Sequence, residues 1–150
     1  MKNHSYLPNV VAYIRGSDEV PELSGEVKFY QNSNFVFVTA DINGLPKTST
    51  GFFGFHIHEG NSCAGKDFAN TKSHYNPANS PHPSHAGDLP PLLYSSGGAY
   101  LAFTTDRFTL RDIIGRTVVI HNKPDDFTTQ PSGNAGTKIG CGVIKRRLVL

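Results

Sequence analysis

The sequence has no tryptophan, only two cysteines and no long apolar segment among its 150 residues. Its uninterrupted apolar runs are only a few residues long, and a helix that crosses a bilayer needs about 20 such residues, so no segment qualifies as a membrane span. The formal net charge is only +2, and the lysines and arginines are scattered along the chain. This argues against a nucleic acid partner, because binding nucleic acid requires a concentrated basic surface.

Two further features bear on the compartment. The first eight residues, Met1 to Pro8, contain no apolar stretch of the kind found in secretory signals. We therefore expect a cytoplasmic protein, or a periplasmic or extracellular one if this is a mature chain with a new initiator methionine. Cys63 and Cys141 are far apart in sequence. They are either free buried thiols, as a reducing compartment favours, or one disulfide between the middle of the chain and its C-terminal strand.

Short strands joined by turns are the expected architecture. Glycine and proline are frequent, with 15 and 10 residues. Strands are predicted where apolar and β-branched residues alternate or cluster, at 9–15, 24–31, 35–42, 51–58, 99–104, 108–110, 114–121 and 139–144. Two stretches without periodicity, 59–91 and 122–136, lie between them. We expect one all-β domain over residues 1–150, an antiparallel sandwich or barrel with two long loops.

Histidine is concentrated in one part of the chain. Six of the seven histidines lie between Phe55 and Asn122. They are His56, His58, His74, His82, His85 and His121. Imidazole is the commonest protein ligand for copper and zinc, and a carboxylate can complete a zinc site. The spacing of these residues indicates two metals rather than one.

The strand histidines are ambiguous when each is taken alone. His56 and His58 are two residues apart on a predicted strand, so both side chains project from the same face and form half of a metal site. Exposed strands also carry such pairs by chance. His121 ends another predicted strand. It is either a metal ligand or an inert, hydrogen-bonded histidine at the edge of the core.

The loop residues favour a metal more strongly. His74, His82, His85 and Asp88 all lie in the stretch 59–91. A loop of this length without secondary structure is uncommon in a compact domain unless it is functional. Gly87 provides a tight turn through which Asp88 can reach the same ion as His85. A polar, solvated loop is the alternative.

Several motifs resemble the copper/zinc superoxide dismutase family. Gly54-Phe55-His56-Ile57-His58-Glu59 is similar to that family's signature Gly-Phe-His-x-His-Glu. Four further segments match the family's zinc loop and its C-terminal signature, in order along the chain: 74–77 with His82, 85–89, 115–121, and 133–136 followed by 141–144. The resemblance covers the chain from about Val10 to Ile144.

The resemblance implies a fold, two metals and an activity. The fold would be an eight-stranded antiparallel Greek-key sandwich or barrel with a metal-binding loop and a shortened electrostatic loop. The activity would be the disproportionation of superoxide to dioxygen and hydrogen peroxide, as antioxidant defence. Copper would bind His56, His58, His74 and His121. Zinc would bind His74, His82, His85 and Asp88.

Other positions acquire roles from the same resemblance. His74 would bridge both ions as an imidazolate and carry the proton that the peroxide product needs. Asp125 would accept hydrogen bonds from His56 and His82, which fixes the orientation of both rings. Cys63 and Cys141 would form the family's disulfide. A homodimer and a copper-delivery partner are both compatible with the family.

Two positions depart from the family pattern. Lys138 stands where the family usually has an arginine beside the copper, and Ser132 where a channel-lining threonine is expected. The stretch 122–138 is also short, without the acidic pair and lysine that usually guide the substrate. We therefore expect Lys138 and the metals to provide most of the attraction for the anion, with a modest dependence on ionic strength.

Two other classes of protein remain possible at this point. One is a non-catalytic metal-binding or copper-delivery domain of the same fold. The presence of Lys138 in place of the family's arginine is compatible with this class. The other is a jelly-roll iron or manganese oxygenase built on His56 and His58. That class would need a glutamate at a ligating position, whereas Glu59 is adjacent to the pair and faces away from it, and it has no use for the histidines of the loop.

The lysine at position 138 leads to a prediction for the variant in which the family's arginine is restored. Arginine holds a small anion at two points and keeps its charge at high pH, whereas lysine is a point charge that deprotonates as the pH rises. We expect Lys138→Arg to raise the rate of superoxide removal severalfold and to extend activity to higher pH. Measured rates across the alkaline range test this, and an unchanged profile would contradict it.

Overall fold

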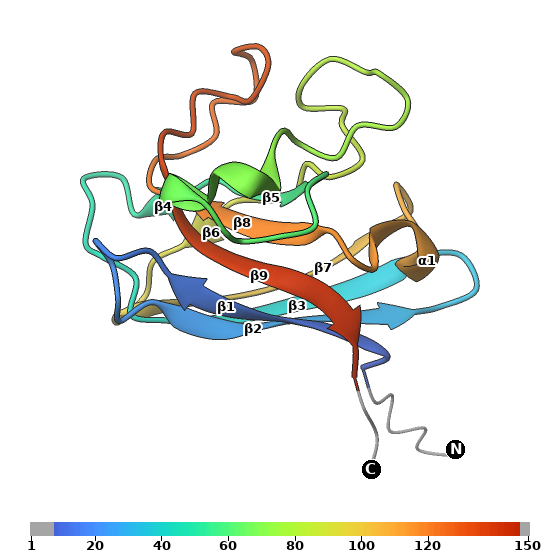
Figure 1. Ribbon diagram of the computed structural model, residues 1–150, viewed down its shortest axis with the longest axis horizontal. Coiled ribbons are helices and arrows are strands. Elements are labelled where there is room, and N and C mark those ends of the chain that lie inside the picture. The colour runs from blue at the N-terminus through green and yellow to red at the C-terminus, as the bar shows by residue number, and fades with distance from the viewer. Residues whose placement is uncertain (1–7, 148–150) are drawn as a thin grey trace.

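Seven strands form one antiparallel sheet that curls on itself in the computed structural model, which describes residues 8–147 (Figure 1). In chain order they are β1 (Val10–Gly16), β2 (Ser24–Gln31), β3 (Val36–Asn43), β5 (Phe55–His58), β7 (Gly98–Thr105), β8 (Thr117–His121) and β9 (Lys138–Arg146). The short strands β4 (Phe52–Phe53) and β6 (Leu92–Leu93) form a separate pair. Two short helical turns, η1 (Lys66–Thr71) and α1 (Leu110–Ile113), complete the elements.

The strand order across the sheet is β5-β8-β9-β1-β2-β3-β7. Strands β1, β2 and β3 lie side by side in the order of the sequence, but β7 returns beside β3 and β9 returns between β8 and β1. Such returns are the mark of a Greek key. The predicted all-β antiparallel Greek-key fold is therefore confirmed, with nine strands assigned within residues 8–147 where eight were expected.

Two local predictions were wrong. The strand expected at 51–58 is interrupted at Gly54, whose N–H donates to the Lys123 carbonyl instead of continuing a ladder. No strand forms at 108–110, where Phe108 and Thr109 precede α1 and Leu110 begins it. Thr109 and Asp112 form a capping box in which the Thr109 N–H donates to the Asp112 carboxylate.

Alternating burial along the strands builds the core. In β3, Val36, Val38, Ala40 and Ile42 face inward, and the residues between them are partly or fully exposed. Each of the buried valine and isoleucine side chains contributes about 1.5–3 kcal/mol relative to exposure. Within the described part of the chain, no helix is long and apolar enough to span a membrane.

The two long loops follow two neighbouring strands, β5 at the edge of the sheet and β8 beside it. Residues 59–91 follow β5, residues 122–137 connect β8 to β9, and β5 and β8 are neighbours. Both loops lie on the same side of the molecule, on the far side of β5 and β8 from β1, β2 and β3 (Figure 1). The topology therefore brings together the two segments that carry most of the candidate site.

Candidate metal centre

Strands β5 and β8 place three of the histidines. The two strands pair antiparallel with His56 opposite Val119 and His58 opposite Thr117, and all their residues are buried. Ile57 points into the apolar core, so His56 and His58 project from the other face of the strand. The His121 N–H donates to the Gly54 carbonyl, which holds the end of β8 against the start of β5.

The loop 59–91 is held to the free edge of β5 by backbone hydrogen bonds. The Tyr75 N–H donates to the Ile57 carbonyl, and the Ile57 N–H donates to the Gly87 carbonyl. Isolated bridges pair His58 with His74 and His56 with Asp88. The expectation that this loop lacks regular structure therefore holds only in part, because two of its segments extend the sheet edge and carry His74 and Asp88 with them.

The structure brings the seven candidate ligands into two groups that share one residue. The four-histidine group consists of His56, His58, His74 and His121. The mixed group consists of His74, His82, His85 and Asp88. Within each group, one donor atom from each residue lies within 4.8 Å of the others. All six histidines are buried, with at most 6% of their surface exposed.

Two rings of the four-histidine group have their N–H directed outward to carbonyls. His58 Nδ1 donates to the Lys72 carbonyl at 2.8 Å, and His121 Nδ1 donates to the Gly136 carbonyl at 3.2 Å. A carbonyl can only accept, so each neutral ring has its lone pair on Nε2. These two Nε2 atoms are 3.3 Å apart. Two lone pairs at this distance repel each other unless a cation lies between them.

Asp125 fixes two further rings in the same way. Its carboxylate accepts from His56 Nε2 and from His82 Nε2, both at 2.8 Å, and from the Phe127 N–H. The lone pairs of these two rings are therefore on Nδ1. His82 Nδ1 lies 3.1 Å from an oxygen of Asp88, another arrangement of two electron-rich atoms.

Burial keeps three rings of the four-histidine group neutral. It lowers the pKa of His56 to about 4 and that of His121 to about 3, and it lowers the pKa of His58 well below the usual value. Burial opposes ionisation of Asp125 as well, but hydrogen bonds from His56, His82 and the Phe127 N–H hold its pKa well below the ordinary value. At neutral pH the rings of His56, His58 and His121 are therefore neutral, and the Asp125 carboxylate is ionised.

The donor atoms fit metal ions. Among residues 8–147, the buried atoms His56 Nδ1, His74 Nε2 and His82 Nδ1 have no hydrogen-bond partner. An unsatisfied buried polar atom costs about 1–3 kcal/mol, and these three point into the two groups. Four imidazoles suit copper or zinc, and three imidazoles with one carboxylate suit tetrahedral zinc.

Lys138 lies beside the four-histidine group. It is the first residue of β9 and pairs with His121 across the sheet. A cavity of about 510 Å³ is lined by Lys138, Ser132, Pro131, His58, His74 and His121, among others. The Lys138 ammonium donates to Thr71 Oγ1 at 2.7 Å and to the Lys72 carbonyl at 3.1 Å, and burial lowers its pKa. The side chain is held more firmly than its flexible stem suggests.

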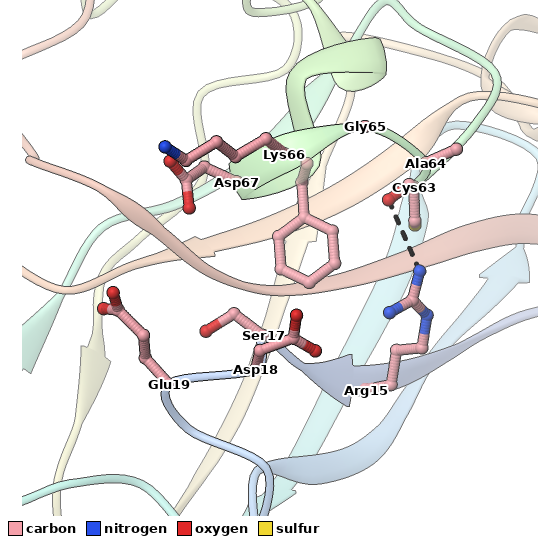
Figure 2. Close-up of a pocket in the computed structure, with 10 residues that line it drawn as sticks. Arg15, Ser17, Asp18, Glu19, Cys63, Ala64, Gly65, Lys66 and Asp67 are labelled. Carbon is pink, nitrogen blue, oxygen red and sulfur yellow. Dashed lines mark hydrogen bonds between the residues drawn. The ribbon is translucent and has the colours of Figure 1, made fainter.

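A disulfide ties the loop to the sheet. Cys63 and Cys141 are bonded, with their Cα atoms 5.9 Å apart, as the resemblance implied. They pack with Phe68 and Val119 in a small second core. Arg15, from β1, donates to the Cys63 carbonyl at 3.4 Å on the rim of a pocket that also contains Asp18, Glu19 and Asp67 (Figure 2).

The sequence did not reveal several residues that support the centre. The side-chain amide of Gln130 forms a reciprocal pair with the backbone of His82, at 2.9 and 2.7 Å. Arg107 donates to the carbonyls of Pro83 and His85. No local pattern marks these contacts, because each joins a loop to a backbone group more than 20 residues away in sequence.

Comparison with known proteins identifies the family. The family model described as "Copper/zinc superoxide dismutase (SODC)" matches residues 23–144. A "Superoxide dismutase [Cu-Zn] 3" from Arabidopsis thaliana is 37% identical over 152 aligned residues, covering 89% of this chain and 88% of the relative. A "Superoxide dismutase [Cu-Zn] 2" from Aquifex aeolicus is 31% identical, covering 83% and 80%.

A solved structure agrees with these matches. The crystal structure of a double mutant of a superoxide dismutase-like protein from Bacillus subtilis superposes with a TM-score of 0.78 and 28% identity. The match covers 88% of this chain and 94% of that one. Together, the family model and the relatives show that this chain belongs to the copper/zinc superoxide dismutase family of enzymes.

Proposed function

We propose that this protein converts two superoxide anions and two protons into dioxygen and hydrogen peroxide. Copper would be held by the four-histidine group and zinc by the mixed group. The observation that carries the proposal is the position of His74, whose ring belongs to both groups at once. A single metal site would not need a shared ring with donors on both sides.

Copper, when bound, supplies the redox chemistry, because it can accept one electron from a first superoxide and return one to a second, whereas zinc has no redox chemistry. The residues of the chain determine the rest. His56, His58 and His121 offer lone pairs in fixed directions, because their N–H groups are already committed to Asp125, Lys72 and Gly136. The mixed group would keep His74 and the loop in place.

His74 is suited to move a proton. Its Nδ1 lies 2.9 Å from Asp88 and 3.3 Å from His85 Nδ1, inside the mixed group. Its Nε2 faces the four-histidine group without a partner among residues 8–147. We assign to Nε2 the uptake of a proton and its release to the outgoing peroxide, which needs protons that superoxide does not bring.

Lys138 and Ser132 would act on the substrate. Both line the cavity that leads to His58, His74 and His121. The ammonium of Lys138 would attract the superoxide anion, and Ser132 would help to narrow the passage. The attraction falls with ionic strength, because part of the Lys138 side chain remains accessible to solvent.

A metal-binding protein without catalysis is the second candidate. It is favoured by one observation, the likeness to a Bacillus subtilis protein described as superoxide dismutase-like.

An assay of purified protein loaded with both metals distinguishes catalysis from metal binding alone. We expect one copper and one zinc per chain by elemental analysis and catalytic superoxide removal that is lost when the copper is withdrawn. Full metal content without superoxide removal would leave only the binding function.

The role of Asp125 can be tested by Asp125→Asn. An amide has one acceptor oxygen and one donor nitrogen, so one of the two rings would have to move its proton to the ligating Nδ1. We expect the affinity for at least one metal to fall about 10–100-fold. Competition with a chelator measures this affinity for each metal.

Asp126→Asn provides a matched control. Asp126 is the exposed neighbour of Asp125, and its carboxylate accepts hydrogen bonds only from Thr128 and Thr129 among the described residues. Metal affinity should be retained in this variant. Equal affinities in the two variants would show that Asp125 does not orient the rings.

The shared ring predicts how many protons leave on metal binding. A neutral imidazole carries one N–H, so His74 must release it if both nitrogens bind metals, while the other five rings already offer a lone pair. At about pH 8, where ordinary histidines are neutral, we expect zinc alone to release no proton. Subsequent copper should release about one.

Titration calorimetry in buffers with different ionisation enthalpies counts these protons. His74→Gln serves as the control, because its amide cannot lose a proton in this range. Release of no proton by the fully loaded wild-type chain would argue against a ring shared by both metals.

A further inference from the structure

Thr71 is a buried polar residue that belongs to neither donor group. It is the last residue of η1, and none of its surface is exposed. Its hydroxyl oxygen lies 2.7 Å from Lys138 Nζ and 2.9 Å from the Phe68 carbonyl. The carbonyl can only accept, so the hydroxyl donates its hydrogen to Phe68. Its lone pairs are then left to accept from the ammonium.

The position of this hydroxyl is fixed by groups around it. Phe68, which accepts the hydrogen, is buried in the small core that contains the Cys63–Cys141 disulfide. The Thr71 carbonyl accepts from the Gly60 N–H, just after β5. Thr71 is therefore held by the sheet edge through its backbone and by the disulfide core through its hydroxyl.

Thr71 and Lys72 together form a two-point seat for the Lys138 ammonium. Lys72 has the positive φ of 60° and ψ of −140°, which directs its carbonyl toward both Lys138 Nζ and His58 Nδ1. This conformation is rare for residues other than glycine. An ammonium has three N–H donors. With two of them committed to this seat, one remains for an anion in the cavity.

We propose that Thr71 is a positioning residue for catalysis, because its hydroxyl holds the Lys138 ammonium where it meets a small anion in the cavity. The proposal rests on the proposed function for the identity of that anion as superoxide. It explains how a lysine can serve at this position: the long stem is flexible, and the seat removes much of that freedom. The competing interpretation is that the hydroxyl only satisfies the Phe68 carbonyl and stabilises the loop.

A double-mutant cycle separates the two interpretations. The variants are Thr71→Val, which keeps the shape and removes the hydroxyl, and Lys138→Met, alone and combined. All are loaded with copper and zinc. The dissociation constant of azide, a small monoanion, is titrated by visible absorption, and kcat/KM for superoxide is measured beside it.

We expect Thr71→Val to weaken azide binding and lower kcat/KM by about threefold to tenfold, the range that one hydrogen bond supports. Thr71→Ser keeps the hydroxyl and should stay within about twofold of wild type. In the Lys138→Met background, Thr71→Val should change azide binding no further, because residues that act through one contact are not additive.

Other outcomes would overturn the proposal. A similar loss with and without Lys138, or no loss at all, would show that Thr71 does not act through the ammonium. If Thr71→Val fails to fold, Thr71→Ala takes its place in the cycle, and loss of the metals in both variants would mark the hydroxyl as structural. If Thr71 and Lys138 are coupled in azide binding but the protein does not remove superoxide, the positioning role of Thr71 stands and the proposed function is wrong. If the protein removes superoxide but the two residues are not coupled, the proposed function stands and the positioning role is wrong.

Discussion

The centre depends on where four imidazole rings donate their single N–H. His58 and His121 donate to backbone carbonyls, and His56 and His82 donate to the Asp125 carboxylate. Because burial keeps His56, His58 and His121 neutral, an outward N–H on each of these rings leaves an inward lone pair. The acceptors lie in the two long loops, so the positions of the metal-binding nitrogens depend on the fold of these loops. The remaining contacts serve to hold the loops in place.

A loop with little apolar content needs other means of support. The segments around Tyr75 and Gly87 use the free edge of β5 as a template for hydrogen bonds. The Cys63–Cys141 disulfide closes a long stretch of chain, which removes conformational entropy from the unfolded state. Gln130 pairs with the backbone of His82 and so joins the second loop to the first. Apolar contacts add to these polar and covalent links, because Tyr75 and Leu89 of the first loop are buried in the main core.

The features that a sequence pattern reveals are those with a local signature. The alternation in β3 and the pair His56 and His58 could be predicted, because strand periodicity fixes the direction of side chains. The break at Gly54 and the turn α1 were missed, since one depends on a distant carbonyl and the other on a cap inside an apolar segment. The seat of Lys138 could not be foreseen either. It is formed by a backbone carbonyl and a threonine 67 residues away, and neither has a signature of its own.

Asp125 has one more consequence for the two groups. One of its oxygens accepts from His56 of the four-histidine group and the other accepts from His82 of the mixed group. This carboxylate is a second connection between the groups, independent of the ring that they share. An ion bound to one group would orient Asp125 and thereby favour ion binding at the other group. By linkage, this coupling free energy is the same in both directions. The two affinities then belong to the pair rather than to either ion alone.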